Sequence, residues 1–206
     1  MLMADLLYWV GLVAVAVSAI TGVFEAERKG MDLVGTVMVA VATGLGGGTV
    51  RDLLLDRQVF WVVDQTYLLA AFGTGIGTFF WARKRNIPPR LILYPDALGL
   101  ALFAVVGTQI ALHWEAPWLV ASLMGVITGV FGGVLRDILC NQVPLIFLPG
   151  ELYASAALAG CLLLIGLQEA GVTPALSAWL AAGVIFGLRW AAMVFRISLP
   201  TFKPRP

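Results

Sequence analysis

Two Arg-Asp pairs follow clusters of glycine at equivalent places in two apolar stretches of the chain. Residues 43–54 read TGLGGGTVRDLL and residues 128–139 read TGVFGGVLRDIL, so the copies are offset by 85 residues (136 − 51). Ionisable side chains are costly within lipid and usually functional there, and glycine weakens a helix. A pattern that combines both features twice indicates a built site.

The charged pairs can be arranged in two ways. Arg51 and Asp52 are adjacent, as are Arg136 and Asp137, and adjacent residues of a helix do not face each other. If the two copies are related by a two-fold axis, Arg51 would instead meet Asp137, and Arg136 would meet Asp52. The alternative is that each pair lies at the end of a span and extends towards the membrane surface.

The glycines of the two copies also have two readings. Gly44 with Gly48, and Gly129 with Gly133, have the spacing of small-residue faces at which helices pack closely. The consecutive Gly46, Gly47 and Gly48 present no single face, which favours a break in the helix. The same is expected at Gly132 and Gly133. A break would free backbone carbonyls, which can coordinate monovalent cations in a protein-lined path.

Polar residues near the glycines are weaker candidates. The hydroxyls of Thr43 and Thr128 would either line a path or bond back to the preceding helical turn, which is the commoner case. Asp96, after Tyr94-Pro95, is expected to cap the start of a helix.

The composition is that of an integral membrane protein. Hydrophobic residues make up 60% of the chain and charged residues 12%, with a net charge of +1. We therefore expect no nucleic-acid partner. One histidine and no nucleophile, phosphate-binding or dinucleotide motif predict no enzymatic activity, no metal site and no cofactor.

Seven apolar stretches are near the length that crosses a bilayer. They are residues 6–24, 33–54, 66–81, 96–112, 118–139, 152–167 and 175–195. With seven spans, one side of the membrane carries most basic residues: Arg28, Lys29, Arg83, Lys84, Arg85, Arg90, Arg196, Lys203 and Arg205. The other side has little beyond Arg57, so we expect the N-terminus outside and the C-terminus in the cytoplasm. The Arg83–Arg85 run is also a candidate contact for anionic lipid.

The two motif copies are separated by an odd number of spans, so the second would cross the membrane in the opposite direction. The sequence thus predicts a single all-α membrane domain over residues 1–206. It would comprise a first three-helix repeat (5–88), a second, inverted repeat (90–170) and a seventh helix (174–196). Inverted repeats typically place their site near the midplane, where the halves meet.

The chain resembles the prokaryotic trimeric intracellular cation (TRIC) channels. The resemblance rests on residues 46–54, on Lys29-Gly30-Met31-Asp32-Leu33-Val34-Gly35 upstream, and on residues 132–139 followed by Pro144. It extends over roughly residues 5–195. It implies a homotrimer in the bacterial inner membrane, with a pore in each subunit that conducts K⁺ and Na⁺ and with the second and fifth spans kinked at the glycines. One departure is Phe131, which stands where the first copy has Gly46.

The resemblance leads to a set of expected pore and gate residues. They are Thr43, Gly46, Gly47, Gly48, Arg51, Asp52, Thr128, Phe131, Gly132, Gly133, Arg136 and Asp137. The same family has also been described as carrying small amino acids such as glycine, so the resemblance implies a secondary transporter as the alternative. Inverted repeats with broken helices are as typical of secondary transporters as of channels. Arg51 or Arg136 would then hold the carboxylate of the substrate.

Overall fold

The computed structural model describes residues 2–85, 87–148 and 152–200, and every regular element in them is helical. The α-helices are α1 (Leu2–Arg28), α2 (Leu33–Leu54), α3 (Phe60–Val63), α4 (Thr66–Ala82), α5 (Leu93–His113), α6 (Trp118–Leu139), α7 (Ala154–Glu169) and α8 (Pro174–Phe195). Two 3₁₀ turns, η1 (Pro89–Ile92) and η2 (Leu145–Phe147), precede α5 and follow α6. The basic residues Lys203 and Arg205, used above for orientation, lie outside the described residues.

The helices coincide with the seven predicted apolar stretches, and only the short α3 was not expected. Five helices, α1, α2, α5, α6 and α8, are long and apolar enough to cross a membrane. The other two, α4 and α7, have 17 and 16 residues. An all-helical membrane fold is therefore confirmed, while the count of seven crossings stays a prediction.

Local sequence explains where the helices begin. The Asp32 side chain accepts a hydrogen bond from the backbone N of Gly35 at 2.8 Å and so caps α2. The expected cap at Asp96 is wrong, because α5 already begins at Leu93. Proline is tolerated in the first turn of a helix, so Pro95 does not delay the start. Asp96 instead lies inside the first turn and is buried.

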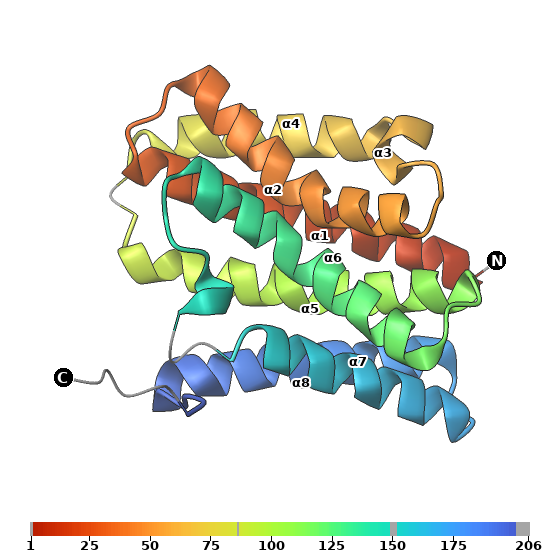
Figure 1. The fold of residues 1–206 in the computed structure, drawn as a ribbon. Helices are drawn as coiled ribbons and strands as arrows, with labels where there is room; N and C mark the ends of the chain where they lie inside the picture. The colour runs from red at the N-terminus through yellow and green to blue at the C-terminus, as the bar shows by residue number, and fades with distance from the viewer. Residues whose placement is uncertain (1, 86, 149–151, 201–206) are drawn as a thin grey trace.

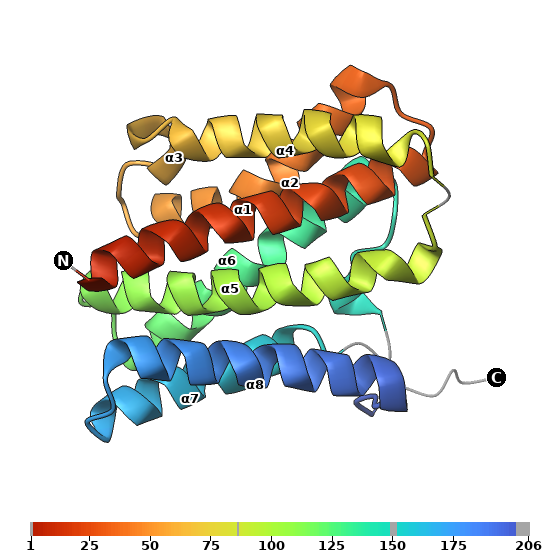
Figure 2. The ribbon, with the colours of Figure 1, turned by 180° about the vertical axis from the view of Figure 1, so that it is seen from behind.

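The helices form two layers. In Figures 1 and 2, α4, α1, α5 and α8 lie side by side, and α2, α6 and α7 cover one face of this layer. Helices α2 and α6 run in opposite directions (Figure 1), and their backbones cross in close contact at Gly47 and Gly132, in the second half of each helix. Helix α1 begins and α8 ends at opposite ends of the bundle (Figure 1). The ends of α2 and α6 that carry the two Arg-Asp pairs are therefore far apart.

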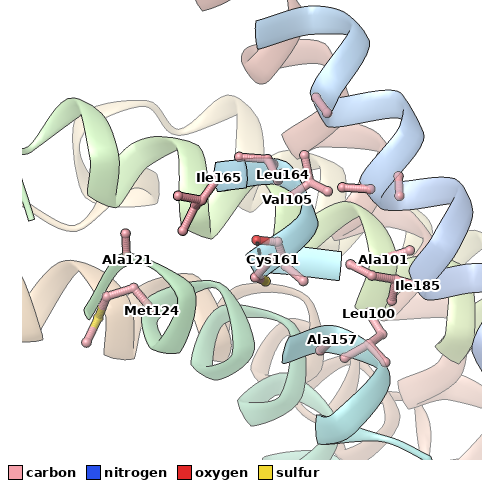
Figure 3. Close-up of a cluster of buried hydrophobic side chains, with 14 of the residues drawn as sticks. Leu100, Ala101, Val105, Ala121, Met124, Ala157, Cys161, Leu164, Ile165 and Ile185 are labelled. Carbon is pink, nitrogen blue, oxygen red and sulfur yellow. Dashed lines mark hydrogen bonds between the residues drawn. The ribbon is translucent and has the colours of Figure 1, made fainter. Parts of the chain in front are cut away.

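The largest apolar core lies where α5, α6, α7 and α8 meet. Figure 3 shows Leu100, Val105, Cys161, Leu164 and Ile185 converging there, all of them buried. This core fixes α7 and α8 against α5, the helix that carries Asp96. Both cysteines are buried and free, as expected for small apolar residues.

Candidate functional site

The second motif copy places Arg136 between two carboxylates. Its Nε donates to Asp137 Oδ1 at 2.8 Å, and its Nη1 donates to Asp96 Oδ1 at 2.7 Å. Nη1 also donates to the hydroxyl of Thr21 on α1 at 3.1 Å. Only 1% of Arg136 is exposed, so these contacts replace the water that its charge would otherwise require.

Asp96 is the hub of this cluster. It accepts a hydrogen bond from the Tyr153 hydroxyl at 3.2 Å, and Arg189 Nη2 lies 3.8 Å from its other oxygen. The guanidinium of Arg189 stacks over the Tyr153 ring, with its central carbon 4.7 Å from the ring centroid. Two arginines and two aspartates, all buried, thus meet at one end of the bundle.

The first motif copy is built on the same plan with fewer acidic partners. Arg51 donates to Asp52 Oδ1 through Nε at 2.8 Å and lies 2.7 Å from the same oxygen through Nη2. Arg57 Nε is 3.5 Å from this oxygen, and the Phe60 ring lies under the Arg51 guanidinium. Arg51 is 2% exposed and Asp52 is fully buried.

Each motif aspartate also orders the loop that follows its helix. Asp52 Oδ2 accepts from the backbone N of Phe60 at 2.9 Å, and Asp137 Oδ2 accepts from that of Leu145 at 3.0 Å. The two acceptors are 85 residues apart, and so are the two donors (145 − 60). Both aspartates therefore join an arginine to the backbone of the next element.

The predicted crossed pairs, Arg51 with Asp137 and Arg136 with Asp52, are wrong. The arginines bind the aspartates next to them in sequence, because the long side chain folds along the helix until Nε meets the neighbouring carboxylate. The antiparallel course of α2 and α6 holds the two pairs at opposite ends of the bundle (Figure 1). Extension to the membrane surface is not observed either, since both arginines are buried within the protein.

The glycines bring α2 and α6 into backbone contact. A Cβ on Gly47 would overlap the carbonyl oxygen of Thr128, and a Cβ on Gly132 would overlap that of Thr43. Both helices continue through these residues, so the predicted break with freed carbonyls is wrong. A kink within the continuous helices stays a prediction.

The run of three glycines is explained by three different neighbours. A Cβ on Gly46 would overlap the side chain of Leu135 on α6, and one on Gly48 would lie 2.6 Å from the Phe60 ring. With Gly47 against Thr128, successive faces of α2 each meet another element. In the second copy, a Cβ on Gly133 would lie 2.9 Å from the Tyr153 hydroxyl.

The remaining candidates from the sequence are Thr43, Thr128 and Phe131. The hydroxyl of Thr43 donates to the Val39 carbonyl and that of Thr128 to the Met124 carbonyl, both at 2.6 Å. This confirms the commoner reading, back-bonding within the helix. Phe131 is 37% exposed and lies outside the core.

Two separate cavities approach the motif copies from opposite ends of the bundle. A cavity of about 280 Å³ reaches Arg51 and is lined by Leu7, Tyr8, Gly11, Arg51, Phe60, Tyr67, Phe103, Val106 and Ile110. Another, of about 210 Å³, reaches Arg136 and Asp137 and is lined also by Glu25, Arg28, Arg90, Ile92, Leu93, Gln142, Val143, Leu145 and Leu148. The cavities share no lining residue, and the α2–α6 crossing lies between the two Arg-Asp pairs.

Sequence reasoning missed several members of the site. Asp96 was read as a cap, and Tyr153 and Arg189 were not considered. Arg189 had a usable signal, because it is the one ionisable residue within its predicted span of residues 175–195. Asp96 carried the same signal in its predicted span of residues 96–112, although its partner Arg136 is 40 positions away. Tyr153 had none, because its contact with Asp96 joins residues 57 positions apart.

The same fold is found in solved TRIC channels. The chain is 38% identical to the TRIC trimeric intracellular cation channel orthologue from Rhodobacter sphaeroides, with a TM-score of 0.89 over 93% of this chain and 99% of that one. A second solved structure, described as the structural basis for conductance through TRIC cation channels, gives 32% identity and a TM-score of 0.86, covering 96% of this chain and 97% of that one.

Curated relatives are membrane proteins. The UPF0126 inner membrane protein YadS of Escherichia coli K12 is 40% identical over 205 residues, 96% of each chain. The UPF0126 membrane protein YvgT of Bacillus subtilis is 33% identical over 177 residues, 81% of each chain. The family described as "Glycine transporter" matches residues 8–83 and 93–169. The chain is a multi-pass membrane protein with the TRIC fold, and it belongs to this TRIC-related "Glycine transporter" family.

Proposed function

We propose that the protein is a monovalent cation channel for K⁺ and Na⁺, assembled as a homotrimer with one conduction path in each subunit. The observation that carries this proposal is the match over more than nine-tenths of the chain to solved TRIC cation channels, with TM-scores of 0.86–0.89. The Rhodobacter sphaeroides protein is described as trimeric.

We place the path between the two halves of the subunit, beside the α2–α6 crossing. Its ends are the two cavities, each of which reaches one Arg-Asp pair. Arginines beside a cation path would repel the ion, but Asp52, Asp96 and Asp137 offset much of their charge. Gly47 and Gly132, in contact with Thr128 and Thr43, would separate the two cavities.

We propose further that the halves are inverted repeats with the N-terminus outside and the C-terminus in the cytoplasm. The contacts of the two motif copies recur at an offset of 85 residues, and α2 and α6 run in opposite directions. The exposed residues Arg83, Lys84 and Arg85 would then face the cytoplasm, where they can contact anionic lipid.

A planar bilayer containing the purified protein tests the channel. Under a KCl gradient, discrete unitary currents should appear and reverse near the K⁺ equilibrium potential. Replacing K⁺ by a large organic cation should abolish them. Currents that reverse at the Cl⁻ potential would contradict the proposal.

A secondary transporter for glycine is the second candidate, favoured by the description of the matching family. In liposomes, a transporter would give saturable glycine uptake driven by an ion gradient and no unitary current in the bilayer. That pair of results would replace the channel by the transporter.

A further inference from the structure

One arginine of the buried charged cluster comes from α8, a helix that carries neither motif copy. Arg189 is 0% exposed, and its guanidinium stacks over the Tyr153 ring. Its Nη2 atom lies 3.8 Å from Asp96 Oδ2. Arg189 therefore pairs with the same carboxylate that binds Arg136.

Asp96 divides its two oxygens between these arginines. Oδ1 accepts from Arg136 Nη1 at 2.7 Å and from the Tyr153 hydroxyl at 3.2 Å. Oδ2 accepts no hydrogen bond from the described residues and faces Arg189. A separation of 3.8 Å is longer than a hydrogen bond, so Arg189 acts on Asp96 mainly through its charge.

The first motif copy has no equivalent of the pair that Asp96 and Arg189 form. The position 85 residues before Asp96 is Gly11, which has no side chain to supply an acid. Arg57, the second arginine of the first group, has the uncharged Gln142 as its counterpart at the same offset (142 − 57). Relative to the first copy, the second copy thus has an additional acid from α5 and takes its second arginine from α8.

Arg136 connects this pair to one end of the proposed path. It lines the cavity of about 210 Å³, which we call the Arg136 pocket. The charged residues in the wall of the pocket are Glu25, Arg28, Arg90, Arg136 and Asp137. Asp96 and Arg189 do not line the pocket, but Asp96 binds the arginine that does. Charges interact more strongly in a protein interior than in water, so both would act on an ion in the pocket without touching it.

We propose that Arg189 sets how tightly a cation is held in the Arg136 pocket. Its positive charge offsets part of the negative charge of Asp96. Without it, Asp96 and Asp137 together would oppose Arg136 alone, and a cation would be held more tightly. Conduction requires that an ion leaves as well as enters, so a device that limits its binding favours passage. The inference rests on the proposed channel and gives α8 a role in it.

The test is the unitary K⁺ conductance as a function of KCl concentration, recorded with the full chain in planar bilayers of uncharged lipid. Arg189→Gln should lower the KCl concentration that gives half-maximal conductance by about twofold or more, because K⁺ then binds more tightly. Currents with the same half-maximal concentration in both proteins would overturn the inference and leave the channel standing. Absence of current from the unmodified protein would contradict the channel itself, and the inference with it.

Arg189→Lys is the matched control, because it keeps the charge and loses the planar guanidinium that stacks on Tyr153. Its half-maximal concentration should stay close to that of the unmodified protein. Equal shifts in Arg189→Lys and Arg189→Gln would show that Arg189 acts through packing alone, which would overturn the inference.

A second uncharged variant keeps the test valid if Arg189→Gln does not fold. Arg189→Met fills the buried site with a flexible apolar side chain, and Asp96 keeps its bonds to Arg136 and Tyr153. It should shift the half-maximal concentration in the same direction as Arg189→Gln. An unshifted value in Arg189→Met would equally count against a role for the charge.

The acid of the pair should give the opposite result. Asp96→Asn should raise the half-maximal concentration, because Arg136 and Arg189 would then repel K⁺ with one fewer acid beside them. The double variant Asp96→Asn/Arg189→Gln removes one charge of each sign, so its value should return towards that of the unmodified protein. A double variant that stays at the value of Asp96→Asn would refute the proposed offset.

Discussion

At the scale of residues, Arg51 and Arg136 differ in the carboxylates that offset their positive charge. Each binds the aspartate that follows it, but Arg136 has a second carboxylate from α5. Removing an aspartate from either group should destabilise the folded protein. The buried arginine would lose its counter-charge, while the free-energy cost of taking it out of water would remain.

Asp96→Asn should destabilise the protein by about 3–5 kcal/mol, because Arg136 and Arg189 would share one fewer negative charge. Thermal or denaturant unfolding of the purified protein measures this. Asp56→Asn, at an exposed position in the loop after α2, is the control and should change stability by less than about 0.5 kcal/mol. Equal effects of the two variants would show that Asp96 is not the hub of a buried cluster.

Double-mutant cycles can separate the observed pairs from the crossed ones. Arg51 and Asp52 should show a coupling energy of about 0.5–3 kcal/mol, whereas Arg51 and Asp137 should be additive within about 0.5 kcal/mol. Unfolding free energies of the single and double alanine variants provide both values. Strong coupling between Arg51 and Asp137 would restore the crossed arrangement.

Sequence patterns located the charged pairs but not all of their partners. The repeat pointed directly to Arg51, Asp52, Arg136 and Asp137. Asp96 was assigned to a helix start because Pro95 precedes it, and only the folded arrangement brings it to Arg136. Pairing across 40 residues depends on how α5 packs on α6, and no local pattern encodes that packing.

At the scale of elements, the bounds of α2 and α6 follow from the apolar stretches, since Asp32 and Pro117 flank their starts. The sequence does not decide in the same way how the glycines shape the two helices. A run of glycines is compatible with either a break or a close approach, and the choice depends on which helix lies opposite. Here each helix places its glycine against a backbone carbonyl of the other.

Gly47→Ala and Gly132→Ala should each destabilise the protein by about 1–3 kcal/mol, because the added methyl group overlaps the facing helix. Gly166→Ala on α7 is the control, since a Cβ there meets no atom within 4 Å. It should be neutral or stabilising by up to about 1 kcal/mol. Similar unfolding temperatures for all three variants would contradict the close crossing.

At the scale of the whole molecule, two small-residue faces are available for contacts between subunits. A Cβ on Gly73 or Gly77 of α4, or on Gly183 or Gly187 of α8, would meet no atom of the described chain within 4 Å. These glycines therefore do not serve helix packing within the described part of a subunit. The repeat bounds at 5–88 and 90–170 stay predictions, as does the separate role of residues 174–196.

The purified protein should have three times the mass of one chain, measured by light scattering with the detergent contribution subtracted. If α4 contributes to the interface, Gly77→Leu should reduce the trimer fraction, while Gly166→Leu, on α7, should not. A monomeric mass at all protein concentrations would contradict the homotrimer.

In the proposed channel, cations pass beside the α2–α6 crossing within each subunit. Thr43→Cys and Thr128→Cys, in a background in which Cys140 and Cys161 are alanine, place a thiol next to that crossing, where the two buried hydroxyls face Gly22 of α1 and Gly107 of α5. Thr78→Cys on α4 is the control. In planar-bilayer recordings, a positively charged thiol reagent should reduce the unitary K⁺ current of the first two variants while channels open, and leave the control unchanged. Equal currents before and after modification of both crossing variants, with labelling confirmed by mass spectrometry, would show that the path lies elsewhere.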